Sequence, residues 1–437
     1  MTEMLNTFQQ GDHPILPRPD HDERARQEFA KGLKGFIQSG LLPGLGPVFK
    51  ARAAKRFERE QGHAPATRHD IRKAMLPDPY FQHYAATNRI AQELIWDSVI
   101  DTIERQLPEI EARAKILSAQ NPAPLETRDD FPTPRYVTAL DIHCMPGGYA
   151  GETKNNGYAG ETKNNGYAGK TKNNGYAGET KNNGYAEPGD IAAGALYDRG
   201  VYLYAMGYMG PTNDDMGRSV ANYIRRTMPD FAPKRILDMG CTVGHSTLPF
   251  KEAFPDAEVI GIDVAAPQIR YAHARAAGLG QDVGFMQRDA SATGFADGSF
   301  DLVVSHILLH ETSGKAMPAI IRECHRLLRP GGLMIHADLP PFDLMDPFTQ
   351  FILDNETWYN NEPFWGAMRE IDQIALARSA GFAAPRFDTA PMAIMEFAVA
   401  AESYTEAAAG SLATRDFTAG EYAPGGGWEV LIAAKAA

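Results

Sequence analysis

The apolar residues of this chain follow two different patterns, one before and one after about residue 230. Up to Pro108 they recur at the spacing of an amphipathic helix, and the clearest set is Ile90, Leu94, Ile95, Val99, Ile103 and Leu107. Proline and glycine interrupt the pattern between such sets. We therefore predict a helical domain over residues 20–134, with helices over 20–117 and a proline-rich linker over 121–134. A flexible N-terminus over residues 1–19 would precede it.

From Arg235 onward, short apolar runs alternate with amphipathic stretches. The runs are RILDM, EVIGID, VGFMQRD, FDLVVS and LMIHAD, and the stretches between them include PQIRYAHARAAG and AMPAIIRECHRLL. Strict alternation of strand and helix predicts a parallel sheet with helices on both faces. The closing run, WEVLIAAKA, suits a last, antiparallel strand. The pattern therefore predicts an α/β domain over residues 228–437.

A unit of nine residues is written four times between these two parts, from Gly151 to Ala186. The unit reads GETKNNGYA, and only Lys170 departs from it. Each copy has one tyrosine as its apolar anchor, which is too little to bury a core, and none has the Asp of calcium-binding nonapeptides. We interpret residues 151–186 as an expanded, mobile loop within a connector over 135–227. A short β-solenoid is the alternative.

The composition is that of an ordinary soluble globular protein. The chain has 437 residues, 43% of them hydrophobic, and a formal net charge of −12. An acidic surface repels phosphate groups, so nucleic acid is not the expected partner. The basic segment from Lys50 to Lys73 leaves an RNA-facing helix open, although the pattern favours a solvated helical face.

Three scattered cysteines and the N-terminal residues indicate the compartment. Cys144, Cys241 and Cys324 have neither zinc-site nor redox-motif spacing, which is typical of a reducing environment. The N-terminus lacks the pattern of a secretory signal, and no apolar run reaches the roughly 20 residues that span a bilayer. We expect a soluble, cytoplasmic protein without a membrane partner. A homodimer is left open.

Aspartates and glycines gather where the predicted strands end. The four aspartates at or just after strand ends are Asp238, Asp263, Asp289 and Asp338. Ligands of doubly wound sheets bind outside these carboxyl ends, so the joint placement predicts a binding site. Gly240 and Gly244 in the first turn let a ligand approach the backbone. Their spacing is not the G-x-G-x-x-G of dinucleotide sites, and no P-loop lysine follows.

Three motifs follow one another in the α/β part: DMGCTVG, FADGSFDLVVSHILLHE and RECHRLLRPGGLMIHAD. In these motifs, residues 228–437 resemble the class I S-adenosylmethionine-dependent methyltransferases, close to the small-molecule enzymes that include the ubiquinone and menaquinone methyltransferases. The resemblance implies a Rossmann-like fold with a doubly wound, mostly parallel, seven-stranded sheet. It also implies S-adenosyl-L-methionine as the cofactor.

The resemblance assigns roles to individual residues. The cofactor-binding residues would be Asp238, Gly240, Cys241, Gly244, Asp263, Asp289, Ala290 and Ser305. Asp263 would hold the ribose, and Asp289 with the Ala290 backbone would lie at the adenine. Thr242-Val243 replaces the commoner Gly-Thr pair, which tightens the loop. The fourth strand ends in SHIL rather than N/D-P-P-Y/F, which disfavours methylation of base or glutamine amides.

Methyl transfer depends mainly on alignment of the nucleophile with the methyl group. A hydroxyl nucleophile also gains from a general base, for which histidine is the usual residue at neutral pH. Two candidates follow the fourth strand, namely His306 and His310, and Glu311 is adjacent to the second. We favour His310. The alternatives are that His306 packs at the strand end and that His310 caps a helix.

The segment DNETWYNNEPFW over Asp354–Trp365 and the tyrosine-rich stretch before the first strand are candidate acceptor-binding regions. The candidate substrate residues are Tyr204, Trp358, Asn361 and Trp365. Aromatic and amide groups suit a small ligand, although core packing explains the same aromatic residues. The histidines and acids lack metal-ligand spacing, so no metal site is predicted.

The sequence therefore predicts a methyltransferase that acts on an oxygen or carbon of a small molecule. Two alternatives remain open. The first is a cofactor-binding protein without activity that serves as an interaction or regulatory subunit. The second is an RNA methyltransferase that uses the basic segment Lys50–Lys73.

Overall fold

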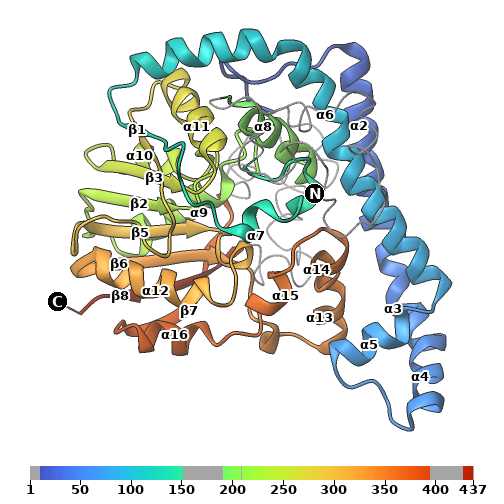
Figure 1. The fold of residues 1–437 in the computed structure, drawn as a ribbon. Helices are drawn as coiled ribbons and strands as arrows, with labels where there is room; N and C mark the ends of the chain where they lie inside the picture. Colours follow the sequence, from blue (N-terminus) through green and yellow to red (C-terminus); the bar gives the residue numbers. More distant parts are fainter. Residues whose placement is uncertain (1–9, 151–189, 208, 394–426, 437) are drawn as a thin grey trace, which may run out of the picture.

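The computed structural model describes residues 10–150, 190–207, 209–393 and 427–436 (Figure 1). The nonapeptide repeat over 151–186 lies outside the described residues, and so do residues 1–9 of the predicted flexible N-terminus. The interpretation of the repeat as a mobile loop therefore stays a prediction.

One sheet forms the core of the α/β part, at the left in Figure 1, with strand order β1-β4-β3-β2-β5-β6-β8-β7. The strands are β1 (Leu125–Glu126), β2 (Arg235–Met239), β3 (Glu258–Asp263), β4 (Gly284–Gln287), β5 (Phe300–His306), β6 (Leu328–Asp338), β7 (Ala383–Pro391) and β8 (Gly427–Ala434). Neighbours from β1 to β6 pair in parallel, whereas β8 is antiparallel to both β6 and β7. The predicted doubly wound, mostly parallel sheet and its antiparallel last strand are confirmed.

The sheet has eight strands where seven were expected. The additional strand, β1, lies inside the predicted proline-rich linker and pairs with β4, with Leu125 opposite Phe285. Both residues of β1 are exposed. A strand of two exposed residues leaves no apolar alternation in the sequence, so only its partner defines it.

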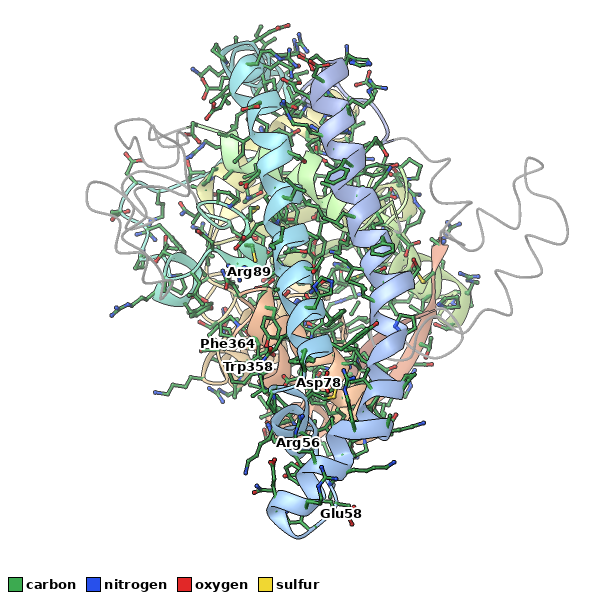
Figure 2. All side chains as sticks on the ribbon, turned by 90° about the vertical axis from the view of Figure 1, so that its right-hand side faces the viewer. Arg56, Glu58, Asp78, Arg89, Trp358 and Phe364 are labelled. Carbon is green, nitrogen blue, oxygen red and sulfur yellow. The ribbon has the colours of Figure 1, made fainter. Side chains whose placement is uncertain are left out.

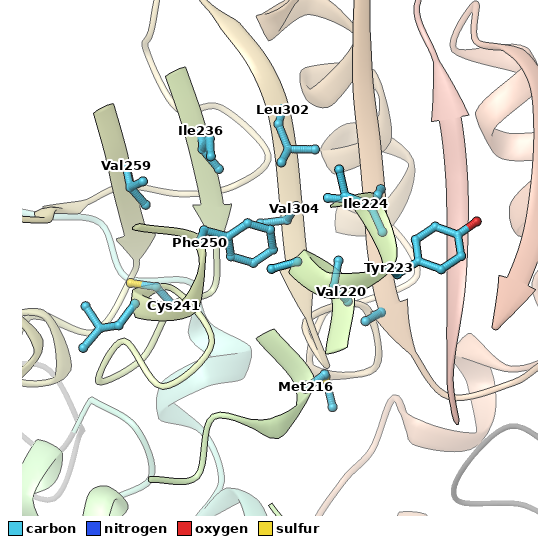
Figure 3. Close-up of a cluster of buried hydrophobic side chains, with 14 of the residues drawn as sticks. Met216, Val220, Tyr223, Ile224, Ile236, Cys241, Phe250, Val259, Leu302 and Val304 are labelled. Atoms are coloured by element: carbon cyan, nitrogen blue, oxygen red, sulfur yellow. The ribbon is translucent and has the colours of Figure 1, made fainter. Parts of the chain in front are cut away.

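Both faces of the sheet are buried, which explains why its strands read as continuous apolar runs. Successive residues of β2 point to opposite faces: Ile236 joins one buried cluster and Leu237 the other. The first cluster includes residues of α9 (Asp215–Thr227), α10 (Leu248–Ala253) and α11 (Ala266–Gly278) (Figure 3). The second includes residues of α12 (Ala316–Leu327) and α16 (Gln373–Ser379).

The N-terminal part is helical, as predicted. Its helices are α2 (His21–Phe36), α3 (Leu45–Val48), α4 (Ala54–Gln61), α5 (Arg68–Met75) and α6 (Pro79–Gln120), with the short turns η1 (Ile37–Leu41), η2 (Leu42–Gly44) and η3 (Phe49–Ala53) between α2 and α4. Helices α2 and α6 lie side by side (Figure 2). Helix α6 runs through Pro108 and ends three residues beyond the expected boundary at 117.

Arginines of the basic segment Lys50–Lys73 make contacts within the protein. Arg52 donates two hydrogen bonds to the carboxylate of Asp78, which caps α6. Arg56 donates to the Ala74 carbonyl oxygen. These contacts favour the interpretation of this segment as a folded helical surface over that of an RNA-facing helix.

Two further groups of elements cover the carboxyl ends of the strands. The first comes from the connector: α7 (Arg135–Thr138), η4 (Ile142–Cys144) and α8 (Ala192–Tyr204). The second follows β5 and β6: η7 (Leu309–Glu311), η8 (Phe342–Leu344), α13 (Pro347–Leu353), α14 (Asn355–Tyr359) and α15 (Trp365–Met368). Within the described ranges, no helix combines the length and the apolar character needed to cross a membrane.

Candidate active site

A cavity of about 520 Å³ lies at the carboxyl ends of the central strands. In the chain, β2 is followed by β3 and β4 on one side, and β5 and β6 then pair on its other side. The crevice at such a reversal is where doubly wound sheets bind ligands. The predicted site residues that line the cavity are Gly240, Cys241, Asp263, Asp289, Ala290, His306, His310, Glu311, Tyr204 and Trp365.

The loop after β2 brings backbone to the cavity wall. Gly240 has a φ of +74°, and a Cβ there would lie 2.7 Å from the Leu308 Cδ1 atom. The N–H groups of Gly240 and Cys241 both donate to the Ile262 carbonyl oxygen. Residues 242–247 form turns, and α10 begins at Leu248.

Asp263, the last residue of β3, places a buried carboxylate beside this loop. It accepts hydrogen bonds from the backbone N–H of Thr242 at 3.0 Å and of Ala265 at 2.9 Å. Burial raises the pKa of Asp263 to about 6, although these N–H groups favour its ionised form. The carboxylate is therefore charged at neutral pH and holds the loop in place.

Three of the predicted cofactor residues lie outside the cavity lining. The Asp238 carboxylate accepts a hydrogen bond from Thr247 Oγ1 at 2.6 Å and lies 3.2 Å from His306 Nδ1. The Ser305 hydroxyl is hydrogen-bonded to His336 Nδ1 at 2.5 Å. Gly244 has a φ of +79° and shapes the loop from behind. These three residues do not line the cavity and contact its neighbouring segments, so their assignment to cofactor binding stays a prediction.

His310 is held by an aspartate at the end of the neighbouring strand β6. His310 Nδ1 lies 2.6 Å from Asp338 Oδ1, and Asp338 also accepts from the backbone N–H of Leu309. Burial opposes protonation, but the Asp338 charge raises the pKa of His310 above its usual value. The Trp365 ring packs edge-on at 4.9 Å. One ring nitrogen is therefore held by Asp338, while Nε2 lies 3.8 Å from Glu311 Oε1 and 4.0 Å from Glu362 Oε2.

His306 has a different environment. Its Nδ1 faces Asp238, and its Nε2 is buried without a hydrogen-bond partner among the described residues. The Phe250 ring lies 5.6 Å away. His306 lines the cavity from the end of β5.

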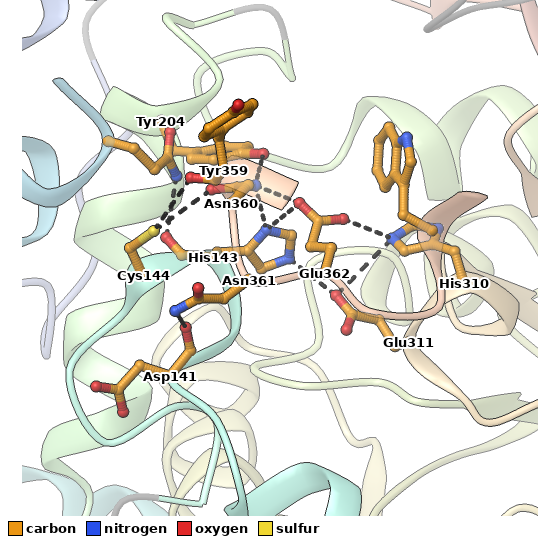
Figure 4. A network of polar contacts seen from close by, with 12 residues as sticks. Asp141, His143, Cys144, Tyr204, His310, Glu311, Tyr359, Asn360, Asn361 and Glu362 are labelled. Carbon is orange, nitrogen blue, oxygen red and sulfur yellow. Dashed lines mark hydrogen bonds and ion pairs between the residues drawn. The ribbon is translucent and has the colours of Figure 1, made fainter. Parts of the chain in front are cut away.

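His143 and Glu362 were not predicted as site residues. His143 Nε2 lies 2.8 Å from Glu311 Oε1, and His143 Nδ1 lies 2.9 Å from Glu362 Oε1 (Figure 4). Although burial lowers it, the two carboxylates raise the pKa of His143 to about 10. We call His143, Glu311 and Glu362, together with His310 and Asp338, the carboxylate cluster.

The four candidate substrate residues divide into two pairs. Tyr204 and Trp365 line the cavity. Trp358 is 51% exposed, and the guanidinium of Arg72 lies 4.0 Å above its ring. Asn361 donates to the Asp141 carbonyl oxygen at 2.9 Å (Figure 4). Trp358 and Asn361 thus contact neighbouring segments and do not line the cavity.

Comparison with known proteins finds similarity to methyltransferases in the α/β part. Residues 236–332 match the family model described as a methyltransferase domain. Over 110 residues the chain is 38% identical to demethylmenaquinone methyltransferase from Thermus thermophilus. The matched region covers 25% of this chain and 49% of that protein. Over 130 residues it is 34% identical to malonyl-[acyl-carrier protein] O-methyltransferase from Methylococcus capsulatus, covering 29% and 46%. The predicted resemblance to methyltransferases is confirmed.

The likeness is confined to part of each protein. The chain spans about half the length of these two curated relatives. Among solved structures, Haemonchus contortus phosphoethanolamine N-methyltransferase 2 in complex with S-adenosyl-L-methionine matches with a TM-score of 0.37 and 17% identity, covering 55% of this chain and 57% of that one.

Proposed function

We propose that this chain, whose residues 236–332 match a methyltransferase domain, transfers a methyl group from S-adenosylmethionine to an oxygen or carbon of a small molecule. One observation carries the proposal. The glycine loop, the Asp263 carboxylate and the Asp338-bound His310 all lie on the same cavity. The proposed cofactor-binding residues and the proposed proton acceptor, His310, therefore face one cavity, where a bound cofactor and a bound acceptor molecule can meet.

The residues on the cavity wall fit the cofactor. Gly240 lines the cavity with backbone alone, because it has no side chain. The charged Asp263 carboxylate is an acceptor for the two ribose hydroxyls. Asp289 and Ala290 lie further along the same wall and suit the adenine amine and ring edge. The cavity volume is in the range that holds small ligands.

When bound, S-adenosylmethionine supplies a methyl group on a cationic sulfonium, which is already a good leaving group. The chain must therefore hold the acceptor in line and manage one proton. His310 Nε2 accepts the proton of an acceptor hydroxyl, and Asp338 at 2.6 Å stabilises the imidazolium that forms. Trp365, packed on the His310 ring, keeps that ring oriented and excludes water from one side.

The acceptor is proposed only as a class. The relatives' names refer to demethylmenaquinone and to malonyl-[acyl-carrier protein], two chemically different acceptors. Tyr204 and Trp365 add aromatic surface to the cavity beside the polar groups of the carboxylate cluster. This mixture suits a small molecule with both an apolar part and hydrogen-bonding groups.

The experiment that tests the proposal measures cofactor binding first. Isothermal titration of the full chain with S-adenosylhomocysteine should give saturable binding, and Asp263→Ala should weaken it by about 100-fold with the fold retained, since hydrogen bonds to a charged group contribute roughly 1.5–3 kcal/mol each. Equal affinity in both proteins would remove Asp263 from the site. Transfer of a labelled methyl group to a component of a cell extract then separates an enzyme from an inactive cofactor-binding subunit.

A further inference from the structure

Three side chains of the carboxylate cluster bring metal-binding atoms together. One ligand atom each from His143, Glu311 and Glu362 all lie within 4.8 Å of one another. The three residues come from η4, from η7 and from the loop between α14 and α15, so no short motif connects them. Glu362 is 1% exposed and His143 is 9% exposed. Buried carboxylates are normally paired with cationic groups or metal ions, so the balance of charge in this cluster shows whether such a partner is missing.

The carboxylate cluster has more acids than bases. It holds three carboxylates, those of Glu311, Glu362 and Asp338, and two imidazoles, those of His143 and His310. Even with both imidazoles protonated, one negative charge remains uncompensated among these five groups. An uncompensated buried charge is strongly unfavourable, so the arrangement is suited to receiving a cation.

A second observation locates the place for that cation. The Oε2 atom of Glu362 is buried and has no hydrogen-bond partner among the described residues. It lies 4.0 Å from His310 Nε2, too far for a hydrogen bond. Figure 4 shows this oxygen between the rings of His143 and His310, with the Glu311 carboxylate nearby.

We propose that His143, Glu311 and Glu362 bind a divalent first-row transition-metal ion at this position. Metal–ligand bonds of about 2.0–2.2 Å in a tetrahedral site place neighbouring ligand atoms about 3.3 Å apart. His143 Nε2 lies 2.8 Å from Glu311 Oε1, and one ligand atom from each of the three residues lies within 4.8 Å of the other two, so the separations lie on either side of that value. Small side-chain shifts therefore complete the coordination.

The surroundings orient the three ligands. The Tyr149 hydroxyl donates to Glu311 Oε1 at 3.0 Å, and the Asn360 amide donates to Glu362. The carbonyl oxygen of His143 accepts hydrogen bonds from Trp96 Nε1 at 2.7 Å and from Gln92 Nε2 at 3.1 Å. Metal ligands are typically held by such outer contacts, which set their direction.

The ligand set indicates the kind of metal. One imidazole nitrogen and two carboxylates suit Zn²⁺, Mn²⁺ or Fe²⁺ better than the thiolate-preferring ions. Three protein ligands leave a coordination position open, as in sites that act on a substrate. His143 and Glu311 line the cavity, so the open position is accessible to an acceptor oxygen. That last role rests on the proposed function, whereas metal binding itself does not.

The test uses the full chain without cofactor or acceptor, so that it is independent of the methyltransferase proposal. Protein dialysed against a chelator is titrated with ZnCl₂ and with MnCl₂ by calorimetry, and with CoCl₂ by visible absorption. We expect each chain to bind one metal ion. The Co²⁺ form should show the visible d–d absorption bands of a low-coordinate, roughly tetrahedral site. Binding of S-adenosylhomocysteine is measured separately and succeeds or fails on its own.

Matched variants locate the ion. Glu362→Gln keeps the shape of the side chain and should weaken Zn²⁺ binding by about 100-fold, and Glu311→Gln should do the same. Glu356→Gln changes another glutamate that lines the same cavity outside the cluster and should leave affinity unchanged. Circular dichroism checks that each variant is folded, and the second glutamate variant serves if the first is not.

Three results would overturn the proposal: no saturable binding of any of the three ions, equal affinity in Glu362→Gln and Glu356→Gln, or binding that persists in both cluster variants. The first result would leave the cluster as an ion-pair network in which His143 bridges two glutamates, with no place for a metal.

Discussion

Two buried centres of this molecule combine histidines with carboxylates, but in opposite proportions. In the first, which we call the Asp198 centre, one carboxylate is surrounded by donors. Asp198 contacts His13 Nε2 and His245 Nε2 at 2.7 Å, the Tyr271 hydroxyl at 2.9 Å, and Arg275 Nε at 3.5 Å. In the second, the carboxylate cluster, three carboxylates share two imidazoles.

The two centres also differ in which buried atoms have no hydrogen-bond partner among the described residues. In the Asp198 centre the unpartnered buried atoms, within the described residues, include His13 Nδ1 and an Arg275 nitrogen. In the carboxylate cluster the atom left over is an acceptor, Glu362 Oε2. The contacts of Asp198 keep its pKa well below the usual value despite burial. In the first centre the carboxylate has donors on both oxygens and joins the N-terminal segment to the loop after β2, whereas the second centre has a spare acceptor that an added cation would satisfy.

The largest effect is expected at the Asp198 centre. Asp198→Ala removes the anion on which four donors converge, and leaves Arg275 buried without its charge partner. Loss of one partner of a buried pair typically destabilises by about 3–5 kcal/mol. Urea unfolding followed by circular dichroism should show this loss in the midpoint. Asp230→Ala, at an exposed carboxylate, is the control, and an equally small change in both proteins would show that the centre does not stabilise the fold.

The second effect concerns turnover and the carboxylate cluster. His310→Ala removes the proposed proton acceptor and should slow labelled methyl transfer by about 100-fold or more, while S-adenosylhomocysteine affinity stays unchanged. His325→Ala changes a histidine that packs on Phe382, away from the cavity lining, and should keep full activity. If His310→Ala lost cofactor affinity instead, the residue would belong to the binding wall and not to the chemistry.

Asp263 is a further buried carboxylate, and it accepts hydrogen bonds from backbone N–H groups while no cationic side chain of the described residues forms an ion pair with it. Its pKa of about 6 is raised above the usual 3.8, so the carboxylate is ionised at pH 7 and mostly protonated at pH 5. If the ribose hydroxyls require the ionised form, S-adenosylhomocysteine affinity falls about tenfold from pH 7 to pH 5. Calorimetry at several pH values measures this. Asp263→Asn should bind weakly with no such slope, and a parallel slope in that variant would assign the effect to another group.

The parts of the site that lie in one continuous stretch could be predicted from the sequence. The glycine loop and Asp263 follow directly from strand–turn patterns, and the structure brings them to the cavity. Asp238 and Ser305 also lie at strand ends, but their side chains are hydrogen-bonded to Thr247 and to His336 and do not line the cavity. Position at a strand end fixes which edge of the sheet a residue occupies, while side-chain direction alternates along the strand.

The rest of the site depends on packing between distant segments. His143 and Glu311 are 168 residues apart, and they meet only because the connector docks over the end of β5. Docking is held by contacts such as those of Trp96 and Gln92 with the His143 carbonyl oxygen, which no local pattern encodes. The adjacent Asn360, and not the predicted Asn361, points to His143, at 3.1 Å. A difference of one residue in a turn decided which amide faces the cluster.

The smallest expected effect is on stability, and it compares the two centres most directly. Glu362→Gln and Asp198→Asn both replace a buried carboxylate by its amide, with little change of shape. In chelator-treated protein, Glu362→Gln should change the unfolding free energy by less than about 1 kcal/mol, because it removes the single surplus negative charge and its amide oxygen can still accept from His143. Asp198→Asn should destabilise clearly, because Arg275 loses its counter-charge. Adding Zn²⁺ at 100 times the wild-type dissociation constant should then stabilise the wild type by about 2.7 kcal/mol and Glu362→Gln, with its 100-fold weaker binding, by only about 0.4 kcal/mol. If zinc stabilised both equally, the ion would bind elsewhere, and the surplus acceptor of the carboxylate cluster would need another partner.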